Sequence, residues 1–286
     1  MRRLSGHTKP FAVLGHPVGH SLSPVMHNAS IEALGIDAIY LAFDVHPNRL
    51  MDVLMAMRDM GFQGTNLTVP LKEIAYSELS QLDESAELVG AVNTVAFTPE
   101  GMIGHNTDGF GFLEAMKEAF GPSIRDESVF VLGTGGAGRA VALVSAREQA
   151  KRIALSDVDT SRAEKVAEEI RRTQDSIEVE VVAPKDQASV AHDYDVVVQS
   201  SPIGMKESDP SLLGPEAFRE GQKVFDLIYM YPETPILRTA REAGARIANG
   251  LGMLLHQGAR SFTIWTGQEP SVKHMREALE KAVYGS

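Results

Sequence analysis

Short apolar segments alternate with segments of helical periodicity along the whole chain. The apolar segments predict strands over residues 11–14, 40–45, 62–69, 91–97, 129–132, 153–156, 177–182, 195–198, 223–228 and 246–248, with a return through residues 102–106 after the fourth of them. Helices are predicted from Pro24, with Ser23 as N-cap, after Pro70, and over residues 47–60, 112–120, 139–146, 161–172, 251–266 and 272–283. This alternation favours an α/β fold built around mostly parallel sheets. The last two helices have no strand of their own, so we expect them to pack against the first half of the chain.

A glycine-rich turn directly follows the predicted strand at residues 129–132. Gly133, Gly135 and Gly138 have the G-x-G-x-x-G spacing of a dinucleotide-binding turn. The first glycine permits a tight turn, the second lets the backbone approach a pyrophosphate, and the third lets the next helix pack close to the strand. Asp157 ends the following predicted strand, where an acidic side chain can accept hydrogen bonds from a ribose. The pattern predicts a dinucleotide site, and the alternative is a tight turn that binds nothing.

Composition narrows the functional classes. The 286 residues are 43% hydrophobic and 23% charged, which is typical of a globular protein long enough for two domains. A net charge of −11 without a dense Lys/Arg run disfavours nucleic acid and anionic membranes as partners. The chain has no cysteine, and no apolar stretch approaches the length that crosses a membrane. Arg2 and Arg3 are not followed by an apolar core, so we predict no signal peptide and a cytoplasmic location.

Two hydroxyls lie at the start of the first predicted helix. Ser21 and Ser23 beside a helix N-terminus suit the binding of a carboxylate, although Ser23 alone is equally explained as a cap. His16 and His20 are four residues apart, but on a Gly/Pro loop this spacing does not place them on one face. No metal site is therefore predicted.

A second group of polar side chains lies at later strand ends. Asn66 and Thr68 share one side of a predicted strand, and Lys72 follows the carboxyl end of that strand, where open α/β sheets bind ligands. Taken singly, Lys72 is explained as a surface lysine, and Asn93 and Asp108 as turn residues. Taken together, they predict a site for a polyhydroxylated ligand, with Lys72 and Asp108 as an ion pair that passes a proton to and from a hydroxyl.

An ordered set of motifs covers nearly the whole chain. The motifs are Gly15-x-Pro17, His20-Ser21-x-Ser23-Pro24-x-x-His27-Asn28, Gly64-x-Asn66-x-Thr68-x-Pro70-x-Lys72, Gly90-Ala91-Val92-Asn93-Thr94, Asn106-Thr107-Asp108-Gly109, Gly133-x-Gly135-Gly136-Ala137, Asp226-x-x-Tyr229-x-x-Pro232-x-Thr234 and Asn249-Gly250-Leu251-Gly252-Met253-Leu254-x-x-Gln257. This set resembles the shikimate dehydrogenase family. The resemblance implies a two-domain α/β fold. An N-terminal α/β substrate-binding domain (1–107) is completed by the C-terminal helices (250–286), and residues 108–249 form a Rossmann-like, doubly wound nicotinamide-binding domain.

The resemblance also implies an activity and its residues. The enzyme would reversibly reduce 3-dehydroshikimate to shikimate by hydride transfer from NAD or NADP, as a monomer or homodimer, with Lys72 and Asp108 as the catalytic pair. The implied substrate-binding residues are Ser21 and Ser23 for the carboxylate, with Asn66, Thr68, Asn93, Gln257 and Tyr229. The implied cofactor-binding residues are Gly133, Gly135, Gly136, Ala137, Gly138, Asp157, Arg162 and Gly250.

One stretch departs from the family pattern. NADP-dependent members end the second strand of the cofactor domain in Asn-Arg-Thr, whereas this chain has Asp157-Val158-Asp159 and retains only Arg162 nearby. The acid at position 157 favours NAD and points to NAD-dependent quinate/shikimate dehydrogenases, whereas Ser23 matches the enzymes specific for shikimate. Quinate or aminoshikimate dehydrogenase is therefore an alternative. A non-catalytic dinucleotide or shikimate sensor is a third interpretation, which predicts loss of Lys72 or Asp108, and both are present.

Overall fold

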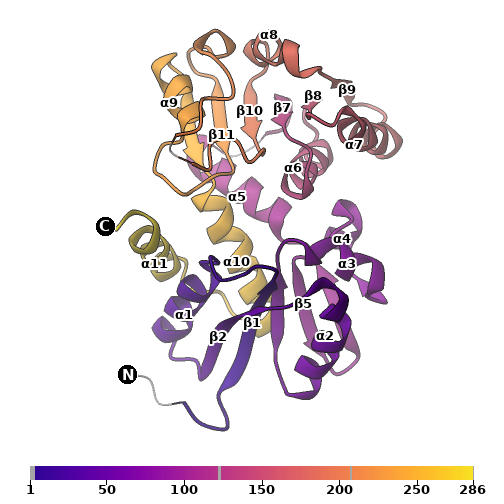
Figure 1. Ribbon diagram of the computed structural model, residues 1–286, viewed down its shortest axis with the longest axis vertical. Coiled ribbons are helices and arrows are strands. Elements are labelled where there is room, and N and C mark those ends of the chain that lie inside the picture. Colours follow the sequence, from indigo (N-terminus) through magenta and orange to yellow (C-terminus); the bar gives the residue numbers. More distant parts are fainter. Residues whose placement is uncertain (1–3, 122–123, 207, 286) are drawn as a thin grey trace. The chain divides into compact units, whose positions relative to one another are not determined.

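The structure, a computed structural model, describes residues 4–121, 124–206 and 208–285 of the chain (Figure 1). Arg2 and Arg3, on which the expectation about a signal peptide rests, lie outside the described residues. The chain divides into two compact units, Met1–Gly111 with Leu255–Ser286, and Phe112–Leu254. The divisions fall within helices α5 (Asp108–Phe120) and α10 (Leu251–Thr266). The assignment of substrate to one unit and cofactor to the other stays a prediction.

The first unit contains a mixed sheet. Its strands are β1 (Lys9–Gly15), β2 (Ala38–Asp44), β3 (Gly64–Leu67), β4 (Gln81–Leu82), β5 (Thr94–Thr98) and β6 (Gly101–His105). Their order is β2-β1-β3-β5-β6-β4, and β1 runs parallel to both of its neighbours. β5 runs antiparallel to both β3 and β6. The antiparallel pairing of β5 with β6 follows from the short turn that joins them. The carboxyl ends of β1 and β3 therefore meet the start of β5 at one edge.

Side-chain alternation along β1 explains why both faces of this sheet are covered. Phe11 and Val13 pack with Tyr40 and Phe262 on one face, whereas Ala12 and Leu14 lie in a separate core on the other. The first face is covered by α1 (Ser23–Ala33) and α10, and the second by α2 (Leu50–Asp59), α3 (Leu71–Glu78) and α4 (Glu84–Val89). The short 3₁₀ helix η1 (Pro47–Arg49) leads into α2.

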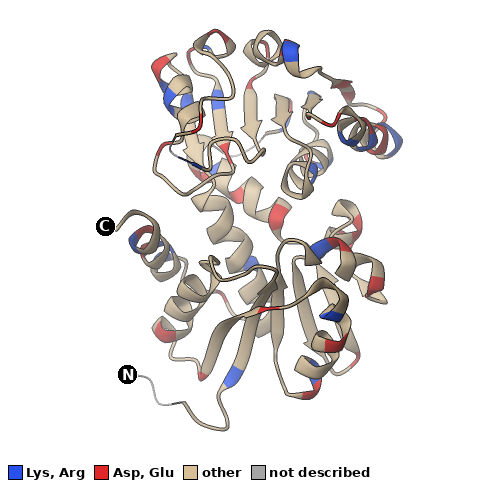
Figure 2. Ribbon diagram, in the orientation of Figure 1, with Lys and Arg blue, Asp and Glu red and all other residues tan. Residues whose placement is uncertain are grey.

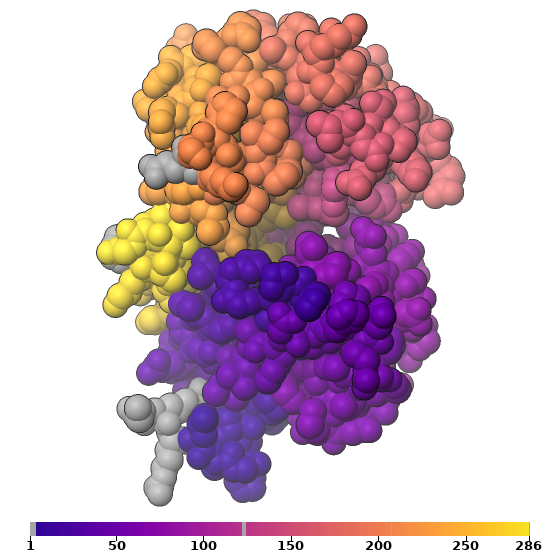
Figure 3. Space-filling model, in the orientation of Figure 1, coloured from indigo at the N-terminus to yellow at the C-terminus, as the bar shows by residue number. Residues whose placement is uncertain are grey.

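The C-terminal helices pack against the first half of the chain, as the sequence predicts. Helix α11 (Val272–Tyr284) lies against α1, and Figure 3 shows these sequence-distant segments side by side in yellow and indigo. The indole nitrogen of Trp265 donates to Val95 O (3.0 Å), and Ser271 N donates to Ser30 Oγ (2.9 Å). Residues from Leu255 onward therefore complete the first unit.

The second unit is a parallel sheet. Its strands are β7 (Ser128–Leu132), β8 (Arg152–Ser156), β9 (Glu178–Val181), β10 (Val196–Gln199), β11 (Lys223–Asp226) and β12 (Arg246–Asn249). The order is β12-β11-β10-β7-β8-β9, with each neighbouring pair parallel. This is the strand order of the dinucleotide-binding fold, in which the topology reverses between β7 and β10. The predicted doubly wound α/β class is confirmed.

Short helices account for most of what the sequence reading missed. The helices of this unit, beyond the end of α5, are α6 (Gly136–Arg147), α7 (Thr160–Thr173), α8 (Gln187–His192) and α9 (Pro235–Glu242), with 3₁₀ turns η2 (Pro184–Asp186) and η3 (Pro215–Ala217). We did not predict α4, α8, α9 or β4, because elements this short contain too few residues for a period to be read. Charged residues gather on the outer faces of helices such as α7, and the central strands are nearly free of them (Figure 2). No helix in the described part of the chain is long and apolar enough to cross a membrane.

Candidate active site

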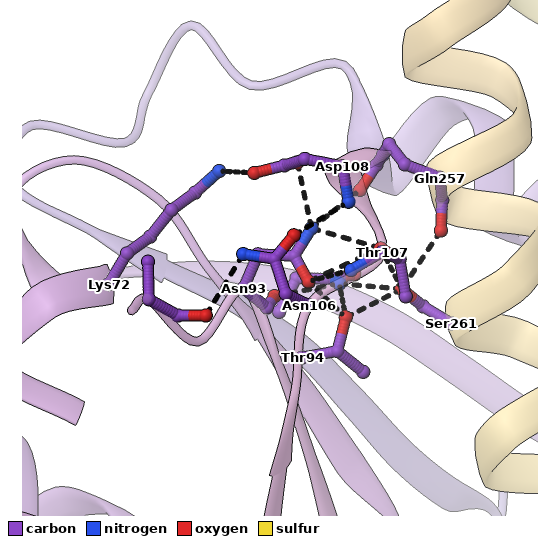
Figure 4. Close-up of polar contacts among 10 residues, drawn as sticks. Lys72, Asn93, Thr94, Asn106, Thr107, Asp108, Gln257 and Ser261 are labelled. Atoms are coloured by element: carbon purple, nitrogen blue, oxygen red, sulfur yellow. Dashed lines mark hydrogen bonds and ion pairs between the residues drawn. The ribbon is translucent and has the colours of Figure 1, made fainter. Parts of the chain in front are cut away.

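Lys72 and Asp108 form an ion pair in the first unit (Figure 4). Nζ of Lys72, near the start of α3, lies 2.6 Å from Oδ2 of Asp108, the first residue of α5. The side chains are 25% and 11% exposed, so water screens the pair less than it screens a surface ion pair. The positive end of the α5 dipole also favours a carboxylate at its first residue.

Asn93 fixes the orientation of the Asp108 carboxylate. Its Nδ2 donates to Oδ1 of Asp108 (2.9 Å) and to Oγ1 of Thr107 (2.9 Å). Its Oδ1 accepts from the backbone N–H of Thr107 at 2.8 Å, so the two ends of the amide cannot exchange places. Each oxygen of Asp108 is thus held by a different residue, and the plane of the carboxylate is determined.

Asn106 fixes the turn that precedes α5. Its Oδ1 accepts from the backbone N–H of Asp108 (3.0 Å), and its Nδ2 donates to Ala91 O (2.9 Å). The hydroxyl of Ser85 accepts from the backbone N–H of Asn106 (3.0 Å). Asn106 and Thr107 are buried, so these residues, which the sequence alone explains as turn chemistry, are part of the frame around Asp108.

Asn66 connects the site to the sheet beneath it. Its Oδ1 accepts from the Tyr40 hydroxyl (2.7 Å), and its Nδ2 lies within 3.1 Å of Asn93 O, Thr94 Oγ1 and Ser261 Oγ. An amide nitrogen has two protons, so these three acceptors already exceed what it can donate. This saturation fits a supporting role, and the expected contact of Asn66 with substrate stays a prediction.

Tyr40 and Ser261 are the members of this network that the sequence reading missed. Tyr40 is buried, and burial raises the pKa of its hydroxyl well above the usual value, against the opposing effect of a hydrogen bond with Ser23. Ser261 Oγ lies 2.8 Å from Thr94 Oγ1 and donates to Gln257 O at 3.0 Å. A signal was available for Ser261, because it follows Gln257 by four residues and so shares its face of α10.

The predicted carboxylate-binding residues lie at the start of α1. The helix begins at Ser23 itself, with Leu22 at the N-cap position and no side-chain cap. The prediction that Ser23 is the N-cap is therefore wrong, because its backbone already belongs to the first helical turn with Pro24. Ser21 Oγ accepts from the backbone N–H of Ser23 at 3.3 Å, so the two hydroxyl residues are neighbours in space.

Thr68 and Gln257 lie at the margins of the network. Thr68 directly follows β3, and its backbone N–H donates to Leu14 O (2.9 Å). A Cβ at Gly15 would lie 2.5 Å from the Thr68 methyl group, so only glycine allows this approach. Gln257 Oε1 lies 3.5 Å from Asn93 Nδ2. The structure thus brings Asn66, Lys72, Asn93, Asp108 and Gln257 into one polar network.

His16 is paired with a carboxylate and not with His20. His16 Nδ1 lies 2.5 Å from Asp44 Oδ1 at an exposed position. Within residues 4–121, 124–206 and 208–285, no group of three His, Asp or Glu side chains could hold a metal ion.

The glycine turn of the second unit has the geometry that its spacing predicts. Gly133 has a φ of +93°, and a Cβ there would lie 2.9 Å from Ser201 N. A Cβ at Gly138 would lie 2.0 Å from Gly133 O, whereas Gly135 and Gly136 have open space around the same position. Helix α6 begins at Gly136 and has no side-chain cap, so this turn fits a pyrophosphate at a helix N-terminus.

Asp157 directly follows β8 and is bonded to the glycine turn. Its Oδ2 accepts from the backbone N–H (2.7 Å) and hydroxyl (3.0 Å) of Thr134, and its Oδ1 accepts from Asp159 N (2.9 Å). Partial burial raises the pKa of Asp157, but these hydrogen bonds and the charge of Arg162 lower it further, so the net pKa is below the usual value. Arg162 pairs with Asp159 (3.3 Å), and Val158 is 88% exposed.

Tyr229 and Gly250 lie in the second unit, after the carboxyl ends of β11 and β12. Tyr229 is half-buried, and burial raises the pKa of its hydroxyl. A Cβ at Gly250 would lie 2.0 Å from Leu227 O, which requires glycine. The expected contacts of these two residues with substrate and cofactor stay predictions.

Comparison with known proteins places this geometry in a family. Residues 13–95 match the model for the shikimate dehydrogenase substrate binding domain, and residues 250–280 match that for the shikimate 5'-dehydrogenase C-terminal domain. The NADP(+) shikimate dehydrogenase of Methanopyrus kandleri is 41% identical over 275 residues, which cover 95% of each chain. The chain belongs to the shikimate dehydrogenase family.

Solved structures of the family have the same fold. The shikimate 5-dehydrogenase of Listeria monocytogenes, solved with shikimate and NAD, superposes with a TM-score of 0.91 at 35% identity, covering 98% of this chain and 99% of that one. The quinate dehydrogenase of Corynebacterium glutamicum, solved with NAD, superposes with a TM-score of 0.88 at 32% identity, covering 95% and 98%. The chain is therefore an oxidoreductase of this family, and its two units have the family architecture.

Proposed function

We propose that this enzyme reversibly reduces 3-dehydroshikimate to shikimate, with a nicotinamide cofactor as hydride donor. The observation that carries the proposal is the Lys72–Asp108 pair, held by Asn93 and Asn106 in a chain of the shikimate dehydrogenase family. A lysine fixed beside a carboxylate can give and take a proton at an alcohol oxygen. The network holds the pair in one geometry.

The roles of the two residues follow from their contacts. In reduction, the carbonyl carbon gains a hydride while Lys72 gives a proton to the oxygen, and in oxidation Lys72 takes that proton back. Asp108 keeps Lys72 in place through Oδ2 and can accept a hydrogen bond from the substrate hydroxyl. The bound nicotinamide supplies or accepts the hydride, so the protein contributes alignment and exclusion of water.

The remaining predicted residues would hold the substrate. We assign the carboxylate to Ser21 and Ser23, which are neighbours at the uncapped start of α1. Thr68, Asn93, Gln257 and Tyr229 would contact other polar groups of the substrate. Asn66 would act mainly by supporting Asn93, Thr94 and Ser261.

The cofactor would bind at the carboxyl edge of the second sheet. Gly133, Gly135, Gly136, Ala137 and Gly138 would approach the pyrophosphate, Asp157 and Arg162 would lie near the adenosine ribose, and Gly250 would contact the nicotinamide half. We propose that NAD serves at least as well as NADP, although the Methanopyrus relative is named for NADP(+). The ionised Asp157 and the uncharged Val158 support this preference.

Quinate/shikimate dehydrogenase is the second candidate. It is supported by the same NAD-type stretch at residues 157–159 and by the likeness to a quinate dehydrogenase solved with NAD. The ordered Lys72–Asp108 pair is evidence against a non-catalytic sensor, which has no use for a proton-transfer pair.

The test is spectrophotometric turnover of shikimate, quinate and aminoshikimate, each with NAD and NADP. Shikimate oxidation that falls on the order of 100-fold or more in Lys72→Ala supports the proposal, whereas preferred turnover of quinate supports the second candidate. No turnover of any of these substrates, with dinucleotide binding intact, would support the sensor. Light scattering on the same samples distinguishes a monomer from a homodimer, the two states that the resemblance allows. The cytoplasmic location and the exclusion of nucleic acid stay predictions from the sequence.

A further inference from the structure

A buried carboxylate holds both ends of the loop that follows β11. Oδ1 of Asp226, the last residue of β11, accepts from Ile228 N (3.0 Å), and its Oδ2 accepts from the Thr234 hydroxyl (2.6 Å). Asp226 and Thr234 are both fully buried. The Asp226 side chain therefore anchors both ends of the loop formed by residues 227–233.

Further contacts fix the body of this loop. Asn249 Nδ2 donates to Tyr231 O (3.2 Å) and Pro232 O (3.1 Å), and Gly250 N donates to Ile228 O (3.2 Å). The loop thus has a defined shape, and Tyr229 lies within it.

The loop also lies at the ligand edge of its sheet. β11 is parallel to β10, and β10 is parallel to β7, so the ends of β11 and β7 are at the same edge. The glycine turn follows β7 at this edge, where doubly wound sheets bind dinucleotides. Tyr229 is therefore carried by a fixed loop on the side of the sheet where the cofactor is expected.

We propose that Asp226 is a positioning residue, which acts through Thr234 and the Ile228 N–H to hold Tyr229 in the orientation that meets the substrate. The inference rests on the proposed function, because it takes Tyr229 to be a substrate contact. A buried carboxylate is costly for the fold, and burial raises the pKa of Asp226 to about 6 despite its hydrogen bonds. We attribute this destabilising carboxylate to a functional need, because it fixes the loop that carries Tyr229 at the edge of the sheet where ligands bind.

Thr234→Val tests the inference, because it removes the hydroxyl and keeps the shape of the side chain. We expect kcat/KM for shikimate to fall about tenfold or more, while the dissociation constant of NAD or NADP alone changes less than about threefold. Thr239→Val is the matched control. Its hydroxyl donates within α9 to Pro235 O (3.0 Å), so its loss should leave the kinetics nearly unchanged.

Two further variants separate positioning from stability. Asp226→Asn keeps an acceptor for Ile228 N and places an amide donor at the Thr234 oxygen, so it should retain most activity, whereas Asp226→Ala should not. In a Tyr229→Phe background, Thr234→Val should cause little further loss if it acts through Tyr229. Hydrogen exchange should speed up in the peptide over residues 227–234 of Thr234→Val and remain unchanged in β7.

Each outcome decides the inference. Normal shikimate kinetics in Thr234→Val or in Tyr229→Phe would overturn it, and so would losses that multiply in the double variant. A wild-type enzyme without shikimate turnover would instead overturn the proposed function. These results are distinguishable, because only the second appears without any substitution.

Discussion

Asn93 donates a hydrogen bond of 2.9 Å to Oδ1 of Asp108, while Lys72 contacts the other oxygen of the same carboxylate. The Asn93 amide and the Lys72 ammonium group therefore each bind one oxygen of the Asp108 carboxylate. Because the backbone N–H of Thr107 fixes the amide, the position of Lys72, the proposed proton-transfer residue, depends on a chain of contacts that begins in the main chain. This dependence makes the site testable one contact at a time.

Replacement of Lys72 by alanine should lower turnover much more than substrate binding. We expect kcat to fall on the order of 100-fold or more, with a small change in KM, because the proton donor is lost while other groups hold the substrate. Steady-state kinetics with shikimate provide the measurement. Lys117→Ala, at an exposed position of α5, is the control. Near-normal turnover in Lys72→Ala would show that another group moves the proton.

Asn93→Ala should impair both catalysis and stability. It removes the hydrogen bond that orients Asp108 and leaves the buried N–H of Thr107 without its acceptor. We expect about a tenfold fall in kcat and a loss of about 1–3 kcal/mol in the free energy of unfolding. Kinetics and urea denaturation measure the two effects. Loss of stability with unchanged kcat would limit Asn93 to a structural role.

Alanine at both Ser21 and Ser23 should weaken binding of shikimate more than binding of its carboxamide analogue. Each hydrogen bond to the charged carboxylate is worth roughly 1.5–3 kcal/mol, and the neutral amide gains less from the same hydroxyls. Calorimetry with both ligands provides the comparison. Equal weakening for the two ligands would argue against a carboxylate site at the start of α1.

Asp157→Asn with Val158→Arg should shift cofactor preference toward NADP. The wild-type carboxylate would lie beside a 2′-phosphate, and like charges at short range repel even with screening by solvent. The double variant removes that charge and adds a cation. The measurement is kcat/KM for NAD and NADP in both enzymes. A wild type that strongly prefers NADP, or a double variant with an unchanged ratio, would contradict the assignment.

The stability of the protein should depend on the ionisation of Asp226. Burial raises its pKa to about 6, above the usual 3.8, so the folded state takes up a proton at a higher pH than the unfolded state. The contribution of this carboxyl group to the free energy of unfolding is therefore greatest below pH 3.8, and it is lost as the pH rises through about 6. From about pH 8 to about pH 4.5, the wild type should gain about 2 kcal/mol relative to Asp226→Asn. Denaturation of both proteins at the two pH values measures this, and parallel profiles would count against it.

The local parts of this fold could be predicted from the sequence. The apolar run before Gly133 and the glycine spacing identify the strand, the turn and the helix, because each depends on neighbouring residues alone. The short helices α8 and α9 could not be predicted in the same way, because tertiary packing and not periodicity stabilises them. The N-cap of α1 was misplaced by one residue, since a cap depends on backbone angles that Ser23 and Leu22 could each supply.

The candidate site shows the same division. The sequence by itself determined which polar residues follow the strands, and their order along the chain determined the family resemblance. Only the tertiary structure decided that Asn66 is saturated by Tyr40, Asn93, Thr94 and Ser261, and that the carboxylate of Asp226 lies buried between Ile228 and Thr234. The physical reason is that a hydrogen bond depends on distance and direction in space, and the partners of Asn66 are as far as 195 positions away along the chain. Local sequence determines which groups can donate and accept, whereas the fold determines which of them meet.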